Sequence, residues 1–89
     1  MRISQRILYR GTVQGVGFRM TTTRCASQFD VTGYVRNLPD GQVEVVVTGE
    51  ADEIGRFLGL VASRMASYIQ GQTAEDVPLQ EFDGFGIRT

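Results

Sequence analysis

Histidine and lysine are both absent from the 89 residues of the chain, and cysteine occurs once, at position 25. Without histidine there is no His general base, no Ser-His triad and no His-ligated metal site. A single cysteine excludes a disulfide framework and a CxxC zinc site. The cysteine-phosphatase loop is excluded too, because the sixth residue after Cys25 is Val31 and not arginine. Histidine- and cysteine-dependent catalysis therefore does not fit this chain.

An excess of charge of one sign is also lacking. The nine basic residues, all arginines, stand against ten acidic residues, and the formal net charge is −1. A chain with this net charge has no positive electrostatic potential overall that would attract nucleic acid or an anionic membrane. No apolar run approaches the length of a membrane span, and residues 1–10 lack the apolar core of a signal peptide. We therefore expect a soluble, cytoplasmic protein with no nucleic-acid or membrane partner.

The length of the chain predicts one domain over residues 1–89. Alternating apolar residues predict strands, and apolar residues at helical spacing predict helices. The predicted strands cover residues 6–13, 31–38, 42–48 and 82–88, and the predicted helices cover 18–30 and 51–68. Residues 70–80 form a polar connection whose shape the pattern does not define. No second apolar face is evident, so we expect a monomer.

The order β-α-β-β-α-β is typical of one architecture. Two helices that each return to an antiparallel sheet give an α+β, ferredoxin-like sandwich. We therefore expect a four-stranded antiparallel sheet with both helices on one face. The hairpin turn is predicted from Leu38-Pro-Asp-Gly41, whose last three residues occupy favoured β-turn positions. Cys25 falls on the apolar stripe of the first helix and is interpreted as a small core residue.

A glycine-rich loop joins the first strand to the first helix. It reads Gly-Thr-Val-Gln-Gly-Val-Gly-Phe-Arg over residues 11–19 and places Arg19 in the first helical turn, where the helix dipole disfavours a cation. The amides of such a loop and of a helix N-terminus form a concave set of donors for phosphate, and Arg19 would add a charged contact. A tight turn with Arg19 paired to a neighbouring carboxylate fits the spacing equally well. The loop is neither a P-loop nor GxGxxG, since Met20 replaces the third glycine.

Asn37 is a second candidate, at the end of a predicted strand and just before the hairpin turn. An asparagine in that position most often bonds its own backbone as an Asx turn. Its neighbour Arg36 alternates to the opposite face, where we expect a solvated role. Asp40 and Glu44 are spaced like the polar residues of a hairpin and not like a metal site.

Taken together, the two motifs resemble the acylphosphatase family. The segment GTVQGVGFR over residues 11–19 is followed by GYVRNLPDGQVEV over residues 33–45, and FGIR over residues 85–88 resembles the last strand of that family. The resemblance covers nearly the whole chain. It implies the ferredoxin-like fold and hydrolysis of the carboxyl–phosphate anhydride of an acyl phosphate, with no cofactor and no metal.

The resemblance also implies the site residues. Arg19 and Asn37 match the two catalytic residues of the family, with Asn37 orienting the attacking water. The residues expected to bind phosphate are Gln14, Gly15, Val16, Gly17, Phe18 and Arg19. The leaving carboxylate has a conjugate-acid pKa of about 4, so the reaction needs no general acid.

Four features depart from the family pattern. Thr21 and Thr89 stand where aromatic residues are frequent, and Asp30 stands where the first helix commonly ends in glycine. If Asp30 adopts positive φ, it costs about 1 kcal/mol relative to glycine. Residues 66–78 lack the usual Gly-Pro turn. These departures concern stability and substrate preference, and none touches the glycine loop or Asn37.

Two other functions remain open. RNA-recognition domains share the predicted fold and bind bases through aromatic residues on their central strands. The predicted strand over residues 42–48, QVEVVVT, has no aromatic residue, which argues against that function. The third possibility is a non-catalytic domain that binds phosphate or carbamoyl phosphate through the same loop.

Overall fold

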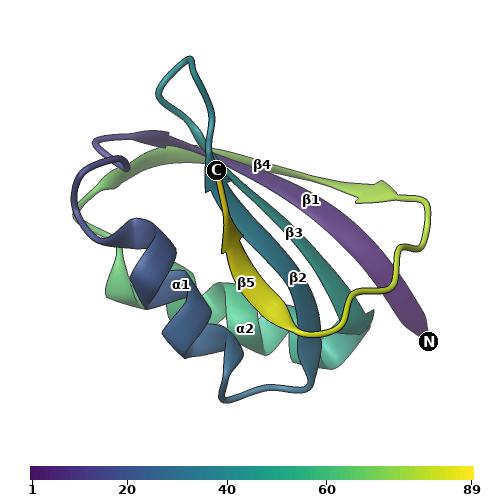
Figure 1. The fold of residues 1–89 in the computed structure, drawn as a ribbon. Helices are drawn as coiled ribbons and strands as arrows, with labels where there is room; N and C mark the ends of the chain where they lie inside the picture. The colour runs from purple at the N-terminus through teal and green to yellow at the C-terminus, as the bar shows by residue number, and fades with distance from the viewer.

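The two helices of the molecule lie side by side on one face of a twisted sheet (Figure 1). The computed structural model describes all residues, 1–89. In chain order the elements are β1 (Arg2–Gly11), α1 (Phe18–Ala26), β2 (Val31–Asn37), β3 (Val43–Glu50), α2 (Ala51–Arg64), β4 (Ile69–Val77) and β5 (Phe85–Arg88). The predicted α+β, ferredoxin-like fold with both helices on one face is confirmed. No helix is long and apolar enough to cross a membrane.

The sheet has five strands in the order β4-β1-β3-β2-β5. The pairs β1–β3, β1–β4 and β2–β3 are antiparallel, whereas β5 pairs with β2 in parallel. The prediction of a four-stranded, wholly antiparallel sheet is therefore wrong. The strand that the sequence did not predict is β4, which occupies most of the polar connection over residues 70–80. This edge strand leaves most of its residues exposed and carries no apolar alternation that the sequence could reveal.

The predicted boundaries differ from the observed ones by a few residues. Helix α1 ends at Ala26 and not near Asp30, because the amides of Gln28 and Phe29 turn back to the carbonyls of Cys25 and Ala26. Asp30 does not adopt positive φ, so the strain considered there is absent. Helix α2 ends at Arg64, four residues before the predicted end. The turn over residues 38–41 is confirmed by the bond from the Gly41 amide to the Leu38 carbonyl, at 3.1 Å.

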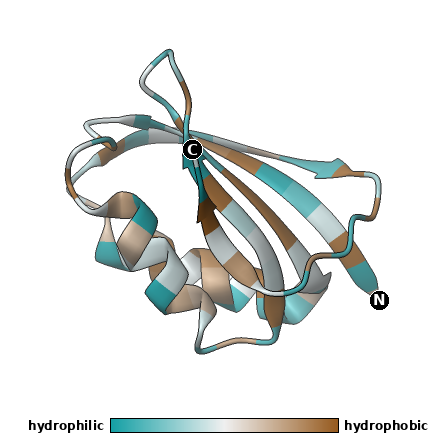
Figure 2. Cartoon of the chain, in the orientation of Figure 1, coloured by the Kyte–Doolittle hydropathy of each residue, from teal (hydrophilic) through white to brown (hydrophobic).

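The hydrophobic core lies between the sheet and the two helices. Figure 2 shows both apolar and polar bands along β1, and Ile7 and Tyr9, which lie on one face of this strand, enter the core. The buried core includes Ile7, Tyr9, Val35, Val45, Val47, Phe18, Cys25, Ile54, Phe57 and Val61. Cys25 is thus the core residue that its position on the apolar stripe predicted.

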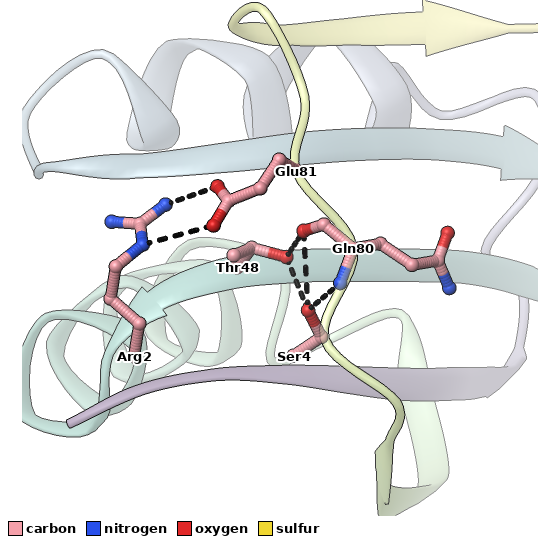
Figure 3. A network of polar contacts seen from close by, with 5 residues as sticks. All are labelled: Arg2, Ser4, Thr48, Gln80 and Glu81. Atoms are coloured by element: carbon pink, nitrogen blue, oxygen red, sulfur yellow. Dashed lines mark hydrogen bonds and ion pairs between the residues drawn. The ribbon is translucent and has the colours of Figure 1, made fainter.

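The opposite face of the sheet is crossed by the segment that joins β4 to β5 (Figure 1). Within it, the Gln80 amide donates to the Ser4 hydroxyl at 2.9 Å, and the Thr48 hydroxyl donates to the Gln80 carbonyl at 2.7 Å (Figure 3). Arg2 pairs with Glu81 at 2.8 Å beside them. This crossing delivers the chain to the far edge of the sheet, where β5 adds to β2.

Candidate active site

A hollow of about 270 Å³ lies where the loop after β1, the start of α1, the end of β2 and β5 meet. Its lining consists of Val13, Gly15, Gly17, Phe18, Arg19, Met20, Asn37 and Ile87. Arg19 and Asn37, from separate motifs, therefore line one cavity. Of the other predicted phosphate-binding residues, Gly15, Gly17 and Phe18 reach this lining, and Gln14 and Val16 do not.

Two glycines give the loop its shape. Gly15 and Gly17 have φ values of 79° and 77°, in the left-handed region that favours glycine. A Cβ atom at either position would meet no protein atom within 4 Å. Glycine is thus required there by the backbone angle and not by crowding, and this angle turns the chain from β1 into α1.

The partial positive charge at the N-terminus of α1 has no acidic partner in the first helical turn and no side-chain cap. Gly17 is the N-cap and supplies no side-chain hydrogen bond, and the first turn contains no acidic residue. The first helical bond runs from the Thr21 amide to the Gly17 carbonyl at 3.0 Å. The preceding amides have no intrahelical acceptor, and together with the helix dipole they favour an anion at this end.

Arg19 adds a formal positive charge at the same place. Its side chain is half-buried in the wall of the hollow and takes part in none of the ion pairs of the structure. The alternative interpretation, in which a neighbouring carboxylate neutralises Arg19, is therefore wrong. The guanidinium and the helix N-terminus carry charge of the same sign, and both are available to an oxyanion.

Asn37 is the last residue of β2, opposite Val43 of β3. Its carboxamide is half-buried and forms no hydrogen bond within the protein, so the Asx-turn interpretation is wrong. That role belongs to Asp40, whose carboxylate accepts bonds from the Gln42 amide at 3.0 Å and from its side chain at 2.7 Å. These bonds lower the pKa of Asp40. The Asn37 carboxamide keeps its donors and its acceptor free.

The side chain of Gln14 ties the glycine loop to the hairpin that follows Asn37. Its Nε2 donates to the carbonyl oxygens of Leu38 at 2.8 Å and of Gln42 at 2.9 Å. Gln14 was predicted as a phosphate-binding residue, but its side chain faces the hairpin. This structural link was not visible in the sequence, because it joins residues more than 20 positions apart.

Comparison with known proteins identifies close relatives. A sequence model of the acylphosphatase family matches residues 5–87. The acylphosphatase of Methanothrix thermoacetophila is 40% identical over 88 residues, which cover 98% of both proteins. That of Chromohalobacter salexigens is 45% identical over 78 residues, 82% of this chain and 86% of the relative. The crystal structure of the acylphosphatase from Bacillus subtilis is similar with a TM-score of 0.88 at 26% identity, and the match covers 100% of both chains.

These two matches, to the Methanothrix and Bacillus proteins, cover almost the full length of this chain and of each relative. The activity of the relatives therefore applies to this chain, and the enzyme is favoured over an RNA-binding module and over a non-catalytic phosphate receptor. Acyl phosphates are the substrates that the family implies. The chain belongs to the acylphosphatase family and has acylphosphatase activity.

Proposed function

We propose that Arg19 and the backbone amides of residues 14–18 bind the phosphoryl group of an acyl phosphate, and that Asn37 orients the attacking water. The observation that carries this proposal is that Arg19 and Asn37 line one hollow and neither side chain has a partner within the protein. Because one chain supplies every group, we also propose that the enzyme acts as a monomer.

Arg19 and the helix N-terminus act through charge. Phosphoryl transfer depends mainly on positioning and on stabilising negative charge, which in the transition state is spread over the three equatorial oxygens. A planar guanidinium can donate to two of these oxygens, and the amides of the loop can reach the remaining one. No acidic side chain lines the hollow, so no carboxylate there repels the negative charge of the transition state.

Asn37 acts through orientation. Its carbonyl oxygen accepts a hydrogen bond from the water, and its amide group donates to a phosphoryl oxygen, which directs the water in line with the leaving group. A neutral carboxamide does not take up a proton. The proton of the water therefore passes to a phosphoryl oxygen of the substrate itself.

The bonds and charges balance without a further group. The water oxygen forms a bond to phosphorus, and the bond from phosphorus to the carboxyl oxygen breaks. A carboxylate, with a conjugate-acid pKa of about 4, leaves unprotonated, so no general acid is required. The products are the carboxylate and inorganic phosphate, and we expect the reaction to proceed in the presence of EDTA.

Hydrolysis of benzoyl phosphate by variants of the two residues tests the proposal. We expect Arg19→Ala to lower kcat/KM by about 10³-fold and to abolish inhibition by inorganic phosphate. Asn37→Ala should lower kcat by about 10²-fold while phosphate still inhibits, because this residue orients water and not the anion. Arg24→Ala, an exposed arginine in the last turn of the same helix, is the matched control and should behave as wild type.

The roles proposed for Arg19 and Asn37 can be contradicted separately. If Arg19→Ala keeps its sensitivity to phosphate, the anion binds elsewhere. If Asn37→Ala keeps the wild-type kcat, another group orients the water. Loss of wild-type activity in EDTA would contradict the proposed chemistry and require a metal.

A further inference from the structure

Part of the hollow is apolar and serves no purpose in holding a phosphoryl group. Four apolar side chains line it, namely Val13, Phe18, Met20 and Ile87. Val13 and Phe18 are almost completely buried. Met20 and Ile87, in contrast, are 55% and 48% exposed, and are among the few large apolar side chains that this protein leaves in solvent.

Core packing does not explain why Ile87 is apolar. In β5 the side chain of Phe85 packs against Phe57 of α2, with ring centroids 5.4 Å apart. Arg88 points to the other face and lies over the Tyr34 ring at 4.1 Å. Ile87 shares the face of Phe85 but lies beyond the core, opposite Val35 in the parallel register. Ile87 is one of the residues that line the hollow, and it also borders a shallower depression beside Tyr34 and Phe82.

The two exposed side chains come from different elements that line the same opening. Met20 lies one residue after Arg19 in α1, and Ile87 lies in β5, which contacts α1 at the edge of the molecule (Figure 1). A phosphoryl group held by Arg19 and the loop would leave its acyl group between them. Arg19 is the only charged residue in the lining, so a carboxylate on the acyl group would find no second cation there.

From this arrangement we propose that Met20 and Ile87 form a subsite for the acyl group and that it favours acyl phosphates with an apolar acyl group. The inference rests on the proposed site, because it places the phosphoryl group at Arg19. It makes Met20 and Ile87 specificity-determining residues with no part in the bond-breaking step. A phenyl group would bury its surface against both, whereas the methyl group of acetyl phosphate would reach little of either.

The ratio of kcat/KM for benzoyl phosphate to that for acetyl phosphate tests the subsite. The double variant Met20→Gln with Ile87→Thr keeps side-chain length on the helix and β-branching on the strand but reduces the apolar surface and makes the subsite more polar. We expect the ratio to fall about tenfold, while kcat/KM for acetyl phosphate stays within about twofold of wild type. Leu79→Gln is the control, since Leu79 is 54% exposed and lies outside the hollow; its ratio should not change.

A binding measurement gives a readout that does not depend on turnover. The chain has three methionines, so methyl-labelled methionine gives three NMR signals. Met65 is buried, and Met1 lies just before β1, whose other end leads into the glycine loop. Benzylphosphonate should shift the Met20 signal more than inorganic phosphate does, with Met1 and Met65 unaffected. The Met20→Gln variant assigns the signal.

Different results would contradict the acyl subsite and the proposed roles of Arg19 and Asn37. An unchanged ratio in the folded double variant, an equal loss for both substrates, or a Met20 signal that responds alike to both probes would overturn the subsite, even if Arg19→Ala is inactive. Conversely, a lowered ratio in the double variant together with wild-type activity in Arg19→Ala would show that Met20 and Ile87 affect the choice of acyl group, and it would overturn the phosphoryl contact of Arg19 on which the proposed subsite rests.

Discussion

Arg36 donates from Nε to one carboxylate oxygen of Glu44 at 2.6 Å, directly across the β2–β3 pair. Arg6 of β1 donates to the other oxygen, also at 2.6 Å. The Glu44 side chain is only 3% exposed, whereas the two arginines are partly open to solvent. One buried carboxylate thus joins three neighbouring strands, and Arg36 precedes Asn37, a residue of the proposed site. Glu44 is the polar hairpin residue that its spacing predicted, whereas Arg36, expected to be solvated, is held in this ion pair.

Replacing Glu44 with glutamine should therefore destabilise the protein. The amide cannot accept two charge-assisted bonds, and its NH₂ group would face a guanidinium. We expect the free energy of unfolding to fall by about 2–3 kcal/mol, less than for a fully buried pair because the arginines can be hydrated. Urea denaturation measures the change. Glu75→Gln is the control: this exposed residue pairs with Arg6 at 3.6 Å, and its loss should cost under about 0.5 kcal/mol.

The same contact predicts a dependence on pH. Burial raises the pKa of Glu44, but the hydrogen bonds from Arg6 and Arg36 outweigh it and hold that pKa below its ordinary value of 4.5. The stabilisation is therefore fully present above the ordinary pKa and is lost as the pH falls through the lower, folded-state pKa. In urea titrations from neutral pH into acid, the difference in stability between wild type and Glu44→Gln should shrink. A difference that stays constant would show that Glu44 contributes through packing alone.

Gln14 offers a test of how the two halves of the site are held together. Gln14→Leu keeps the approximate volume but removes the donors to the Leu38 and Gln42 carbonyls. We expect a loss of about 1–2 kcal/mol in stability, and a fall of about tenfold in kcat because the loop and Asn37 are no longer held in register. Gln72→Leu, on the exposed edge strand β4, should leave kcat unchanged. Equal kcat in both variants would mean that backbone packing alone fixes the site.

Much of the fold could be predicted because its signals are local. The turn over residues 38–41 follows from proline and glycine in fixed positions, and the inner residues of β2 alternate as Val31, Gly33 and Val35, all buried. The start of α1 at Phe18 follows from the glycines before it. Strand β4 could not be predicted, since an exposed edge strand pairs through its backbone and needs no apolar pattern.

The candidate site also contains some residues that the sequence could predict and others that only the fold reveals. Arg19 and Asn37 belong to short contiguous motifs, so a resemblance to a family was enough to select them. Ile87 could not be found from sequence, because its place depends on the parallel pairing of β5 with β2, a contact between distant segments. Met20 was visible as a residue of the loop motif, but only the fold brings it near Ile87.

Two glycines in α2 should be replaceable with a gain in stability. Gly55 and Gly59 lie on the exposed side of the helix, and a Cβ atom there would meet nothing within 4 Å. Each change to alanine should raise the free energy of unfolding by about 1 kcal/mol and leave activity intact. Gly33→Ala is the opposite case, with φ at 141° and a Cβ that would collide with the Val46 carbonyl. Thermal melting of the three variants should therefore give shifts of opposite sign.

Tyr9 provides a test of the core beneath the site. Its ring is fully buried and packs against Phe18 at 4.9 Å between centroids, but its hydroxyl has no hydrogen-bond partner. Burial also raises the pKa of Tyr9 above its usual range. Tyr9→Phe keeps the ring contact and removes the unpaired polar group, so we expect stability to rise by about 1 kcal/mol with kcat unchanged. Tyr68→Phe, at a partly exposed position, should change stability little. A clear loss of stability in Tyr9→Phe would instead reveal a buried water that bonds the hydroxyl and would make it part of the support under the loop.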